Sequence, residues 1–227
     1  MIDLKYQNDI KNIYTEDYVR EFRSIHGPNS PINQKYLMNQ EKIKKFLRKD
    51  DKWLDACCGE AWHFTAIEED YADCTGVDIS SAQISAAQKN NPGHKFICTD
   101  IMNANFPGNY FNLITSFWGG YCYFNTREQI MKFFEKIISW TAIDGHVYVD
   151  ILTPNLIRTF NDSAYSARTN STVTFITDDR WSYEDCGGTH VMLSPPFEEI
   201  FKVFEGRFKD FYWDEFSSQL IAISKLD

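Results

Sequence analysis

The residues WLDACCGEAWHF, numbers 53–64, join an apolar run to the start of a predicted helix through two cysteines and one glycine. The run KWLDA predicts a short strand, and the helix is predicted from Ala61 to about Asp70. In an open parallel sheet, the turn after the first strand must let the backbone approach a ligand closely, which favours small side chains. We therefore interpret the two cysteines as residues tolerated for their size, and not as reactive thiols.

Downstream of this turn, strands and helices alternate. Further strands are predicted at DCTGVD, KFICTD, NLITSF and DGHVYVDIL, and helices at 81–90 and 126–140. Ser80 with Gln83, and Thr126 with Gln129, have the spacing of capping boxes for these helices. The alternation indicates βαβ units, and therefore a mostly parallel sheet with helices on both faces.

The pattern changes after the fifth strand. Residues 155–170 are polar and predict a loop, and a β-hairpin with its turn at 186–188 follows. A helix is predicted over 197–204. The last two runs, FKDFYWD and SSQLIAISK, leave no room for a helix between them, so they should pair antiparallel at the sheet edge. The expected class is α/β: a Rossmann-like, doubly wound, seven-stranded sheet, mostly parallel with an antiparallel C-terminal strand, an N-terminal helical lid and an inserted hairpin.

The length and charge of the chain restrict its function. A chain of 227 residues fits one domain, and its formal net charge is −9. Nucleic-acid binding depends on phosphate neutralisation and leaves a basic footprint, so we expect no nucleic-acid partner. The densest basic run, EKIKKFLRKD, carries Ile43, Phe46 and Leu47 at helical spacing and is interpreted as the solvent-facing side of an amphipathic helix.

We find no targeting signal in the sequence, and no cysteine spacing that is typical of a metal site or a disulfide framework. The first residues, MIDLKYQNDIKNIY, contain no apolar core of a signal sequence, and no segment is long enough to span a bilayer. The six cysteines show no C-x-x-C spacing, and several lie in strand-like runs where Cys acts as a small buried hydrophobe. We expect no disulfide framework, no metal site, no membrane partner and a cytoplasmic location.

The turn at 55–61 also resembles a known motif. A strand that ends in LD, a small-residue turn with a central glycine and a following helix are similar to motif I of the class I S-adenosylmethionine-dependent methyltransferases. The usual motif has three glycines; here Gly59 keeps its place, and Cys57 and Ala61 occupy the other two positions. The residues of this run are similar to motif I of some quinone-ring C-methyltransferases.

Further landmarks of this family follow in order. Asp78, at the end of the second predicted strand, matches the acidic residue that holds both ribose hydroxyls, and a carboxylate can accept two hydrogen bonds from a diol. Asp100 and Ile101 match the aspartate that binds the adenine amino group and the hydrophobic residue beside the ring. The resemblance therefore implies S-adenosyl-L-methionine as the cofactor.

Two later runs extend the match. FPGNYFNLITSFWGG resembles the family's P-x-x-x-F-D-x-V run, with Asn112 in place of the usual Asp. WTAIDGHVYVDIL resembles the L-K-P-G-G turn and fifth strand, with Gly145 alone left of the glycine pair. The resemblance covers about residues 40–225. It implies one methyltransferase domain with four parts: an N-terminal helical cap (1–50), a cofactor-binding core (51–152), a substrate-side insertion (153–196) and a C-terminal helix with antiparallel strands (197–227).

The resemblance also implies a set of cofactor contacts. Asp55 would orient the methionine part or, alternatively, cap the following helix. Trp62 would flank the methionine end or pack in the core. Tyr14 and Tyr18 would cover the cofactor or form a helix packing face at i, i+4. The full expected set is Tyr14, Tyr18, Asp55, Ala56, Cys57, Gly59, Ala61, Trp62, Asp78, Ile79, Gln83, Asp100, Ile101, Ser116, Phe117 and Trp118.

The run SFWGGYCYF follows the fourth strand, where the methyl group should meet its acceptor. Aromatic faces attract cations such as a sulfonium. We expect an aromatic box drawn from Phe117, Trp118, Tyr121, Tyr123 and Phe124, while others of these rings pack on the core. The expected catalytic residues are Tyr121, Tyr123 and His190. Four more acid–base candidates have competing structural interpretations, as His190 does: His146, Asp150, Arg158 and Tyr183.

The implied activity is methyl transfer to a small-molecule acceptor, a metabolite or natural product, by in-line displacement. A carrier-bound acceptor stays open, because it requires only an open pocket. No D/N-P-P-Y run follows the fourth strand, which disfavours amino-directed methylation of nucleic acid. Two other classes stay open: a non-catalytic cofactor-binding module or sensor with a degenerate loop, and a nicotinamide-dependent dehydrogenase, against which the missing G-x-G-x-x-G counts.

Overall fold

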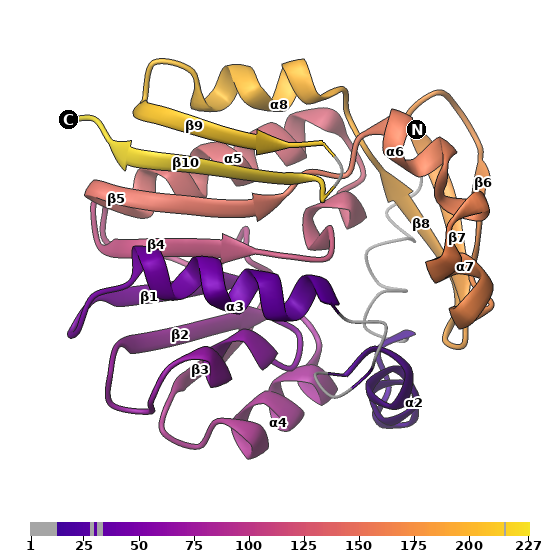
Figure 1. Ribbon diagram of the computed structural model, residues 1–227, viewed down its shortest axis with the longest axis horizontal. Coiled ribbons are helices and arrows are strands. Elements are labelled where there is room, and N and C mark those ends of the chain that lie inside the picture. The colour runs from indigo at the N-terminus through magenta and orange to yellow at the C-terminus, as the bar shows by residue number, and fades with distance from the viewer. Residues whose placement is uncertain (1–12, 28–29, 31–33, 216) are drawn as a thin grey trace.

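The computed structural model describes residues 13–27, 30, 34–215 and 217–227, so the first part of the predicted cap lies outside the described residues. A seven-stranded sheet has the order β3-β2-β1-β4-β5-β10-β9 (Figure 1). Its strands are β1 (Lys52–Ala56), β2 (Asp73–Asp78), β3 (Lys95–Cys98), β4 (Phe111–Ser116), β5 (Thr141–Asp150), β9 (Phe208–Asp214) and β10 (Gln219–Lys225). β10 pairs antiparallel with both neighbours and the other pairs are parallel, which confirms the predicted Rossmann-like class.

Helices cover both faces of this sheet. The longer ones are α2 (Glu16–His26), α3 (Gln34–Phe46), α4 (Ser81–Asn90), α5 (Arg127–Trp140) and α8 (Phe197–Phe204). α3 lies on one face, and α5 and α8 lie on the other (Figure 1). Successive strand residues point to opposite faces, so Trp53 joins the core under α3 whereas Leu54 joins the core under α5. Full burial of a side chain such as Leu54 contributes about 2 kcal/mol.

The two predicted capping boxes have different outcomes. At α5, Thr126 accepts from the N–H of Gln129, and the Gln129 side chain accepts from the N–H of Thr126, each at 3.2 Å. At α4, Ser80 accepts from the N–H of Gln83 at 3.2 Å. The Ser80 N–H, however, donates to Asp78 at 2.9 Å. The box at α4 is therefore half formed, because Asp78 takes the donor that Gln83 would have bound.

The helix predicted over 61–70 is wrong in length and type, because the chain forms only the 3-10 helix η1 (Trp62–Ala66). The hydroxyls of Tyr36 and Thr65 both donate to the Trp62 carbonyl, at 2.9 and 2.8 Å. A continuing α-helix would use that carbonyl in its own backbone ladder. Side-chain donors thus end the helix early.

The loop predicted over 155–170 is also wrong. The segment contains the short helices α6 (Pro154–Arg158), η3 (Phe160–Asp162) and α7 (Ala164–Thr169). The side chains of Thr153 and Ser163 accept from backbone N–H groups at the starts of α6 and α7, at 3.3 and 3.0 Å. Polar residues that predicted a loop therefore serve as helix caps.

The predicted hairpin is confirmed, with one additional strand. β7 (Arg180–Asp185) pairs with β8 (Gly188–Leu193), and β6 (Thr172–Phe175) joins β7 to make a three-stranded antiparallel sheet. Figure 1 shows this small sheet and α2 beyond the carboxyl ends of β1, β4 and β5. The Tyr18 hydroxyl of α2 donates to Asp185 of β7 at 2.9 Å. Two segments far apart in the chain thus meet where the parallel strands end.

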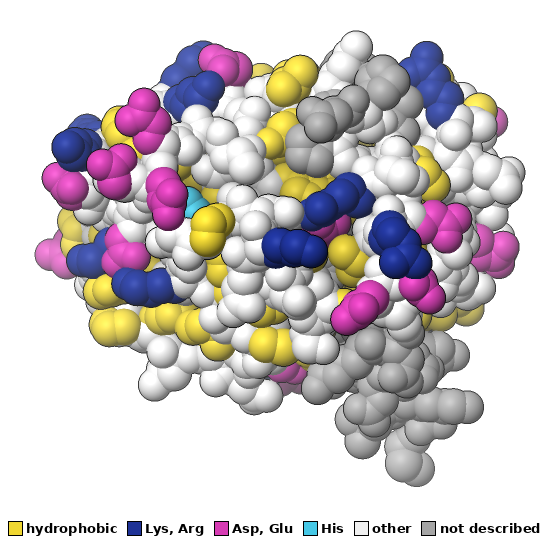
Figure 2. Space-filling view, turned by 90° about the horizontal axis from the view of Figure 1, so that it is seen from below, with side chains coloured by type: hydrophobic (Ala, Val, Ile, Leu, Met, Phe, Trp, Pro, Cys, Tyr) yellow, Lys and Arg dark blue, Asp and Glu magenta, His cyan; other side chains and the backbone are white. Residues whose placement is uncertain are grey.

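The surface of α3 confirms the amphipathic interpretation of the basic run. Ile43 is fully buried, whereas Lys44 and Lys45 are exposed. On the face shown in Figure 2, basic side chains are interspersed with acidic ones. Within the described ranges, no helix is both long enough and apolar enough to cross a bilayer.

Candidate functional site

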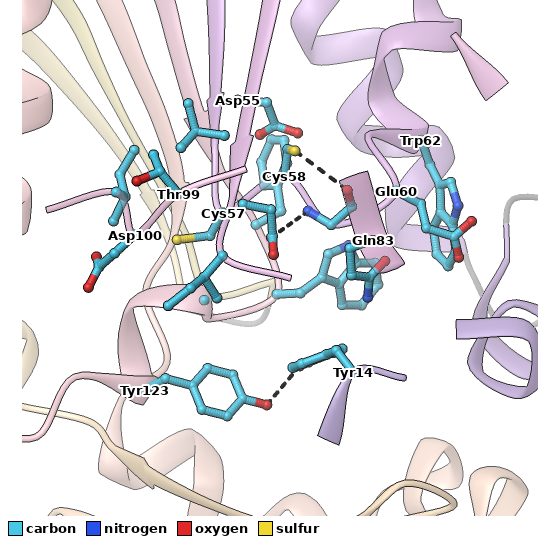
Figure 3. A pocket seen from close by; sticks show the side chains of 18 of the residues that line it. Tyr14, Asp55, Cys57, Cys58, Glu60, Trp62, Gln83, Thr99, Asp100 and Tyr123 are labelled. Carbon is cyan, nitrogen blue, oxygen red and sulfur yellow. Dashed lines mark hydrogen bonds between the residues drawn. The ribbon is translucent and has the colours of Figure 1, made fainter. Parts of the chain in front are cut away.

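A pocket opens at the carboxyl ends of β1, β2 and β4, in the crevice where open α/β sheets bind ligands. The turn after β1 forms one wall, and the ends of β2 and β3 form the next. In Figure 3, Thr99 and Asp100 lie on one side of the pocket and Trp62 and Glu60 on the other. Tyr14, ahead of α2, lies opposite the turn, so elements from the cap and the core enclose the same space.

The turn after β1 holds three alternate residues in the left-handed backbone region. Cys57, Gly59 and Ala61 have φ values of 59°, 52° and 52°. These are the positions at which the resembling motif carries its glycines. Glycine adopts this region freely, whereas other L-residues do so at a cost of roughly 1–2 kcal/mol. The chain therefore keeps the backbone path of the motif and strains two residues to do so.

Glycines across from the turn make room for the cysteine side chains. A Cβ at Gly120 would lie 2.5 Å from the Cβ of Cys57, and a Cβ at Gly76 would lie 2.8 Å from the Sγ of Cys58. Burial, followed by the nearby charge of Asp78, raises the pKa of both thiols well above the usual value. Protonated thiols are poor nucleophiles, so both cysteines fill space, as expected.

Asp78 connects the turn to the end of β2. One carboxylate oxygen accepts from the N–H of Gly59 and the other from the N–H of Ser80, both at 2.9 Å. Burial raises the pKa of Asp78 although these backbone donors oppose the shift. The backbone N–H of Ile79 also favours the charged carboxylate, and Asp78 lines the pocket. The carboxylate is therefore held at the pocket wall, where it can accept from a ligand.

Asp55 lies deeper, at the end of β1, and is 2% exposed. The Thr115 hydroxyl donates to it at 2.6 Å, and the Trp53 indole N–H donates to Thr115 at 2.9 Å. Burial raises the pKa of Asp55 to about 7, with Asp78 adding to the rise and Thr115 opposing it. A cationic group next to Asp55 would restore its charged form.

Three polar atoms on the pocket wall are buried without a hydrogen-bond partner among the described residues: Oε1 of Glu60, Nε1 of Trp62 and Oε1 of Gln83. An unpaired buried polar atom costs about 1–3 kcal/mol. The other oxygen of Glu60 pairs with Arg23 of α2 and accepts from Asn90. This wall thus suits a ligand that brings both donors and an acceptor.

The opposite wall is less polar. Ile79 and Ile101 line it together with Thr99 and Asp100. One oxygen of Asp100 accepts from the N–H of Met102 at 2.9 Å, which leaves the other for a ligand. An apolar slot with a single carboxylate beside it matches a flat heterocycle that carries an amino group.

The loop after β4 adds an aromatic wall of Phe117, Trp118, Tyr123 and Phe124. Trp118 has φ 62°, a rare value for a bulky residue, and its N–H donates to Asp150 at 2.9 Å. Backbone strain of this kind is concentrated at functional sites, where the surrounding structure holds it in place.

The structure does not bring Tyr121 to the pocket, in contrast to the sequence expectation. Its side chain is fully buried against α5, and its hydroxyl accepts from the N–H of Leu152 at 2.8 Å. The 3-10 helix η2 (Gly120–Tyr123) sends successive rings in different directions, so Tyr123 faces the pocket and Tyr121 the core.

Five other expected residues are also absent from the pocket lining: Tyr18, Ala56, Ala61, Ser116 and His190. Ala56 and Ala61 are buried in the two core clusters, because their side chains point away from the turn. The Ser116 hydroxyl is buried without a partner in the described structure. Tyr18 and His190 form hydrogen bonds behind the pocket wall instead.

Several lining residues were not predicted as cofactor contacts: Phe22, Cys58, Glu60, His63, Val77, Thr99 and Gly120. Phe22 follows Tyr18 by one helical turn, a spacing that could have indicated it. Burial lowers the pKa of His63 to about 3, so its ring is neutral. The ring packs on that of Phe117, with the two ring centres 4.4 Å apart. Glu60 carried no signal, because a carboxylate in a turn is usually solvated.

Two of the other acid–base candidates have structural partners outside the pocket. His146 Nδ1 accepts from the backbone N–H of Ser224 at 3.1 Å. The guanidinium of Arg158 lies 4.5 Å from the centre of the Phe175 ring. Across the described ranges, His, Cys, Asp and Glu side chains form no group of three or more that could hold a metal ion.

Comparisons with known proteins agree with this architecture. Residues 54–145 match the family model described as a methyltransferase domain. The structure is similar to the sugar N-methyltransferase KedS8 from Streptoalloteichus sp (13% identity, 93% of both chains covered, TM-score 0.68). It is similar to CalS10, an amino pentose methyltransferase from Micromonospora echinaspora (13% identity, 93% of this chain and 98% of that chain, TM-score 0.65). It is also similar to the PH0226 protein from Pyrococcus horikoshii (16% identity, 93% of this chain and 99% of that chain covered, TM-score 0.70). The comparison with curated proteins gave no significant match.

The matched residues contain the end of β1, the left-handed turn, Asp78 and Asp100, which build most of the pocket wall. Residues 54–145 thus form a methyltransferase domain. Solved structures that share its fold include S-adenosylmethionine-dependent methyltransferases, one of them described with S-adenosylmethionine, a cation, bound. The pocket fits this cation: its charged lining residues are Asp55, Glu60, Asp78 and Asp100, with no Lys or Arg among the lining side chains.

Proposed function

We propose that this enzyme methylates a small-molecule acceptor, a metabolite or natural product, on an amine. The observation that carries the proposal is the acidic, aromatic and covered character of the pocket. The hydroxyl groups of Tyr14 and Tyr123 lie 2.8 Å apart and close the space opposite the turn. Such an enclosure suits a small acceptor better than a folded macromolecule.

The proposed cofactor, S-adenosyl-L-methionine, would lie across the carboxyl ends of the strands in one orientation. Asp78 would accept from the ribose hydroxyls. Ile79 and Ile101 would flank the adenine, with Asp100 accepting from its amino group. Asp55 would face the methionine ammonium, near the unpaired Trp62 and Gln83 atoms.

The bound cofactor supplies a methyl group that is already activated by the positive charge on sulfur. The task of the protein is alignment, with the acceptor atom held about 3 Å from the methyl carbon and opposite the sulfur. Phe117, Trp118 and Phe124 would exclude water and stabilise positive charge with their ring faces. The strained backbone of Trp118 supports a fixed position for this wall.

An amine acceptor is supported by charge and by analogy. The pocket lining carries four carboxylate side chains and no Lys or Arg, an environment that attracts the cationic cofactor and favours a cationic acceptor beside it. KedS8 and CalS10, which share the fold, are described as acting on a sugar nitrogen and on an amino pentose. We therefore favour an amino sugar or an amine of similar size as the acceptor.

A carrier-bound acceptor is a variant of the same proposal, in which the carrier stays outside and only the amine enters. We also propose a cytoplasmic location, supported by six cysteines that are all free thiols. Both points are independent of the chemistry in the pocket.

Calorimetry and turnover together test the proposal. S-adenosylhomocysteine should bind in isothermal titration, and S-adenosylmethionine with a panel of amino sugars should yield S-adenosylhomocysteine, measured by chromatography. The matching sugars with hydroxyl groups in place of the amines serve as controls and should give no product. Binding without turnover of any amine or alcohol would favour a sensor, and methylation of the hydroxyl controls alone would contradict the amine assignment.

A further inference from the structure

A chain of four side chains connects the small sheet to the pocket wall. Asp185 Oδ1 lies 3.0 Å from His190 Nε2, and His190 Nδ1 lies 2.7 Å from the Tyr123 hydroxyl. The Tyr123 hydroxyl lies 2.8 Å from that of Tyr14 (Figure 3). Tyr14 and Tyr123 line the pocket, whereas the side chains of His190 and Asp185 are 1% and 2% exposed. This series of four side chains thus begins at the pocket wall, with Tyr14, and ends at the buried carboxylate of Asp185.

The buried end fixes the direction of each hydrogen bond. Burial alone would raise the pKa of Asp185, but His190, a backbone N–H and the Tyr18 hydroxyl together hold it below its usual value. A carboxylate only accepts, so His190 carries its proton on Nε2 and accepts from Tyr123 at Nδ1. Tyr14 then donates to Tyr123. The lone pairs of the Tyr14 oxygen are left for a donor in the pocket.

Building on the proposed function, we infer that this chain is a proton relay that deprotonates the methyl acceptor, and that the acceptor arrives as an alkylammonium. The acceptor donates an N–H proton to the Tyr14 oxygen. The Tyr14 proton passes to Tyr123, and the Tyr123 proton passes to His190 Nδ1. Tyr14 therefore touches the acceptor, while His190 and Asp185 act through the two tyrosines.

The step balances in protons and electrons. The electron pair freed on the acceptor nitrogen forms the bond to the methyl carbon, and the electron pair of the methyl–sulfur bond stays on sulfur. The product is an N-methylated ammonium, S-adenosylhomocysteine and an imidazolium that is paired with Asp185. After the product leaves, the imidazolium returns its proton along the same tyrosines to water.

Among the described residues, four tyrosine rings surround His190. The rings of Tyr14, Tyr18, Tyr123 and Tyr183 face it, with ring centres 5.6–6.0 Å away. Asp185 is its one charged hydrogen-bond partner within the described structure. Burial raises the pKa of Tyr14 and Tyr123, so the hydroxyls of these two relay residues stay protonated and conduct protons without storing them.

Steady-state kinetics with the amino-sugar panel test the relay. Tyr123→Phe and His190→Asn should each lower kcat about 100-fold, with KM and S-adenosylhomocysteine binding little changed. The deficit should shrink as the pH approaches the pKa of the amine in water, because the acceptor then arrives neutral. Tyr183→Phe is the matched control: its ring faces His190 but its hydroxyl donates to Ser171, outside the relay. It should keep the wild-type kcat.

A nitrogen NMR spectrum of the S-adenosylhomocysteine complex gives a readout that needs no turnover. His190 should carry its proton on Nε2, and Asp185→Asn should change this distribution. A proton on Nδ1 in the wild type would overturn the relay whatever the acceptor is. Equal kcat for Tyr123→Phe and Tyr183→Phe, or a deficit that does not vary with pH, would also overturn it. With the expected tautomer intact, absence of turnover by the wild type would contradict the proposed acceptor alone.

Discussion

The Cβ of Cys57 lies 2.5 Å from the point where a side chain at Gly120 would begin. The turn after β1 and the loop after β4 therefore approach each other closely at these two residues. Cofactor and acceptor would meet between the same two segments. Gly120→Ala should therefore lower the free energy of unfolding, by about 1–3 kcal/mol, because one of the two loops must move. Urea unfolding measures the change.

Cys57→Gly should restore much of the lost stability in the Gly120→Ala background, because it removes the clashing atom and relieves the strained φ. A double-mutant cycle should give a coupling energy of at least about 1 kcal/mol. Gly108→Ala is the control, since its Cβ would meet its nearest neighbour at 3.6 Å. Additive effects of the two substitutions would show that the loops adjust independently.

Asp78→Asn should weaken S-adenosylhomocysteine binding about 10- to 100-fold, the cost of losing charge-assisted hydrogen bonds to a diol. The amide would also place an NH₂ group against the N–H of Gly59 or Ser80. Asp73→Asn, at the exposed start of the same strand, should leave binding unchanged in the same calorimeter. Equal losses in both variants would mean that β2 is perturbed as a whole.

Cofactor affinity should depend on pH through Asp55. Its pKa is raised to about 7 in the free protein, so below that pH the group is neutral and cannot pair with the methionine ammonium. S-adenosylhomocysteine affinity should fall by up to about tenfold per pH unit below pH 7 and level off above it. Thr115→Val removes a donor that lowers this pKa and should move the midpoint to higher pH. Asp55→Asn should abolish this dependence, and a profile that it leaves unaltered would assign the effect to another group.

Arg23→Gln should loosen the cap over the pocket. Glu60 is 2% exposed on its side chain, and Arg23 is its charged partner. Without it, the carboxylate keeps a 3.4 Å hydrogen bond from Asn90, so a loss of about 1–3 kcal/mol in unfolding free energy is expected. Arg20→Gln is the matched control on α2, because its ion pair with Asp17 is exposed and should contribute little. Identical melting curves for the two variants would show that the ion pair with Glu60 does not hold α2 in place.

The central sheet was predictable because its signals are local. The apolar run around Trp53 and Leu54, the turn residues after it and the carboxylates at strand ends all lie within short windows of sequence. The reverse holds for Tyr121 and Tyr123, whose opposite directions depend on a 3-10 turn that no periodicity indicated. Asp185 had no local signal either, since its partners His190 and Tyr18 are brought to it by hairpin pairing and by α2.

The small β6–β8 sheet lies outside the residues that match the methyltransferase model. In the proposed relay, His190 and Asp185 thus lie outside the matched residues and reach them through the Tyr123–His190 hydrogen bond. Side chains of β6–β8 do not line the pocket, so exchanging this segment should alter proton transfer through His190 and leave cofactor binding intact.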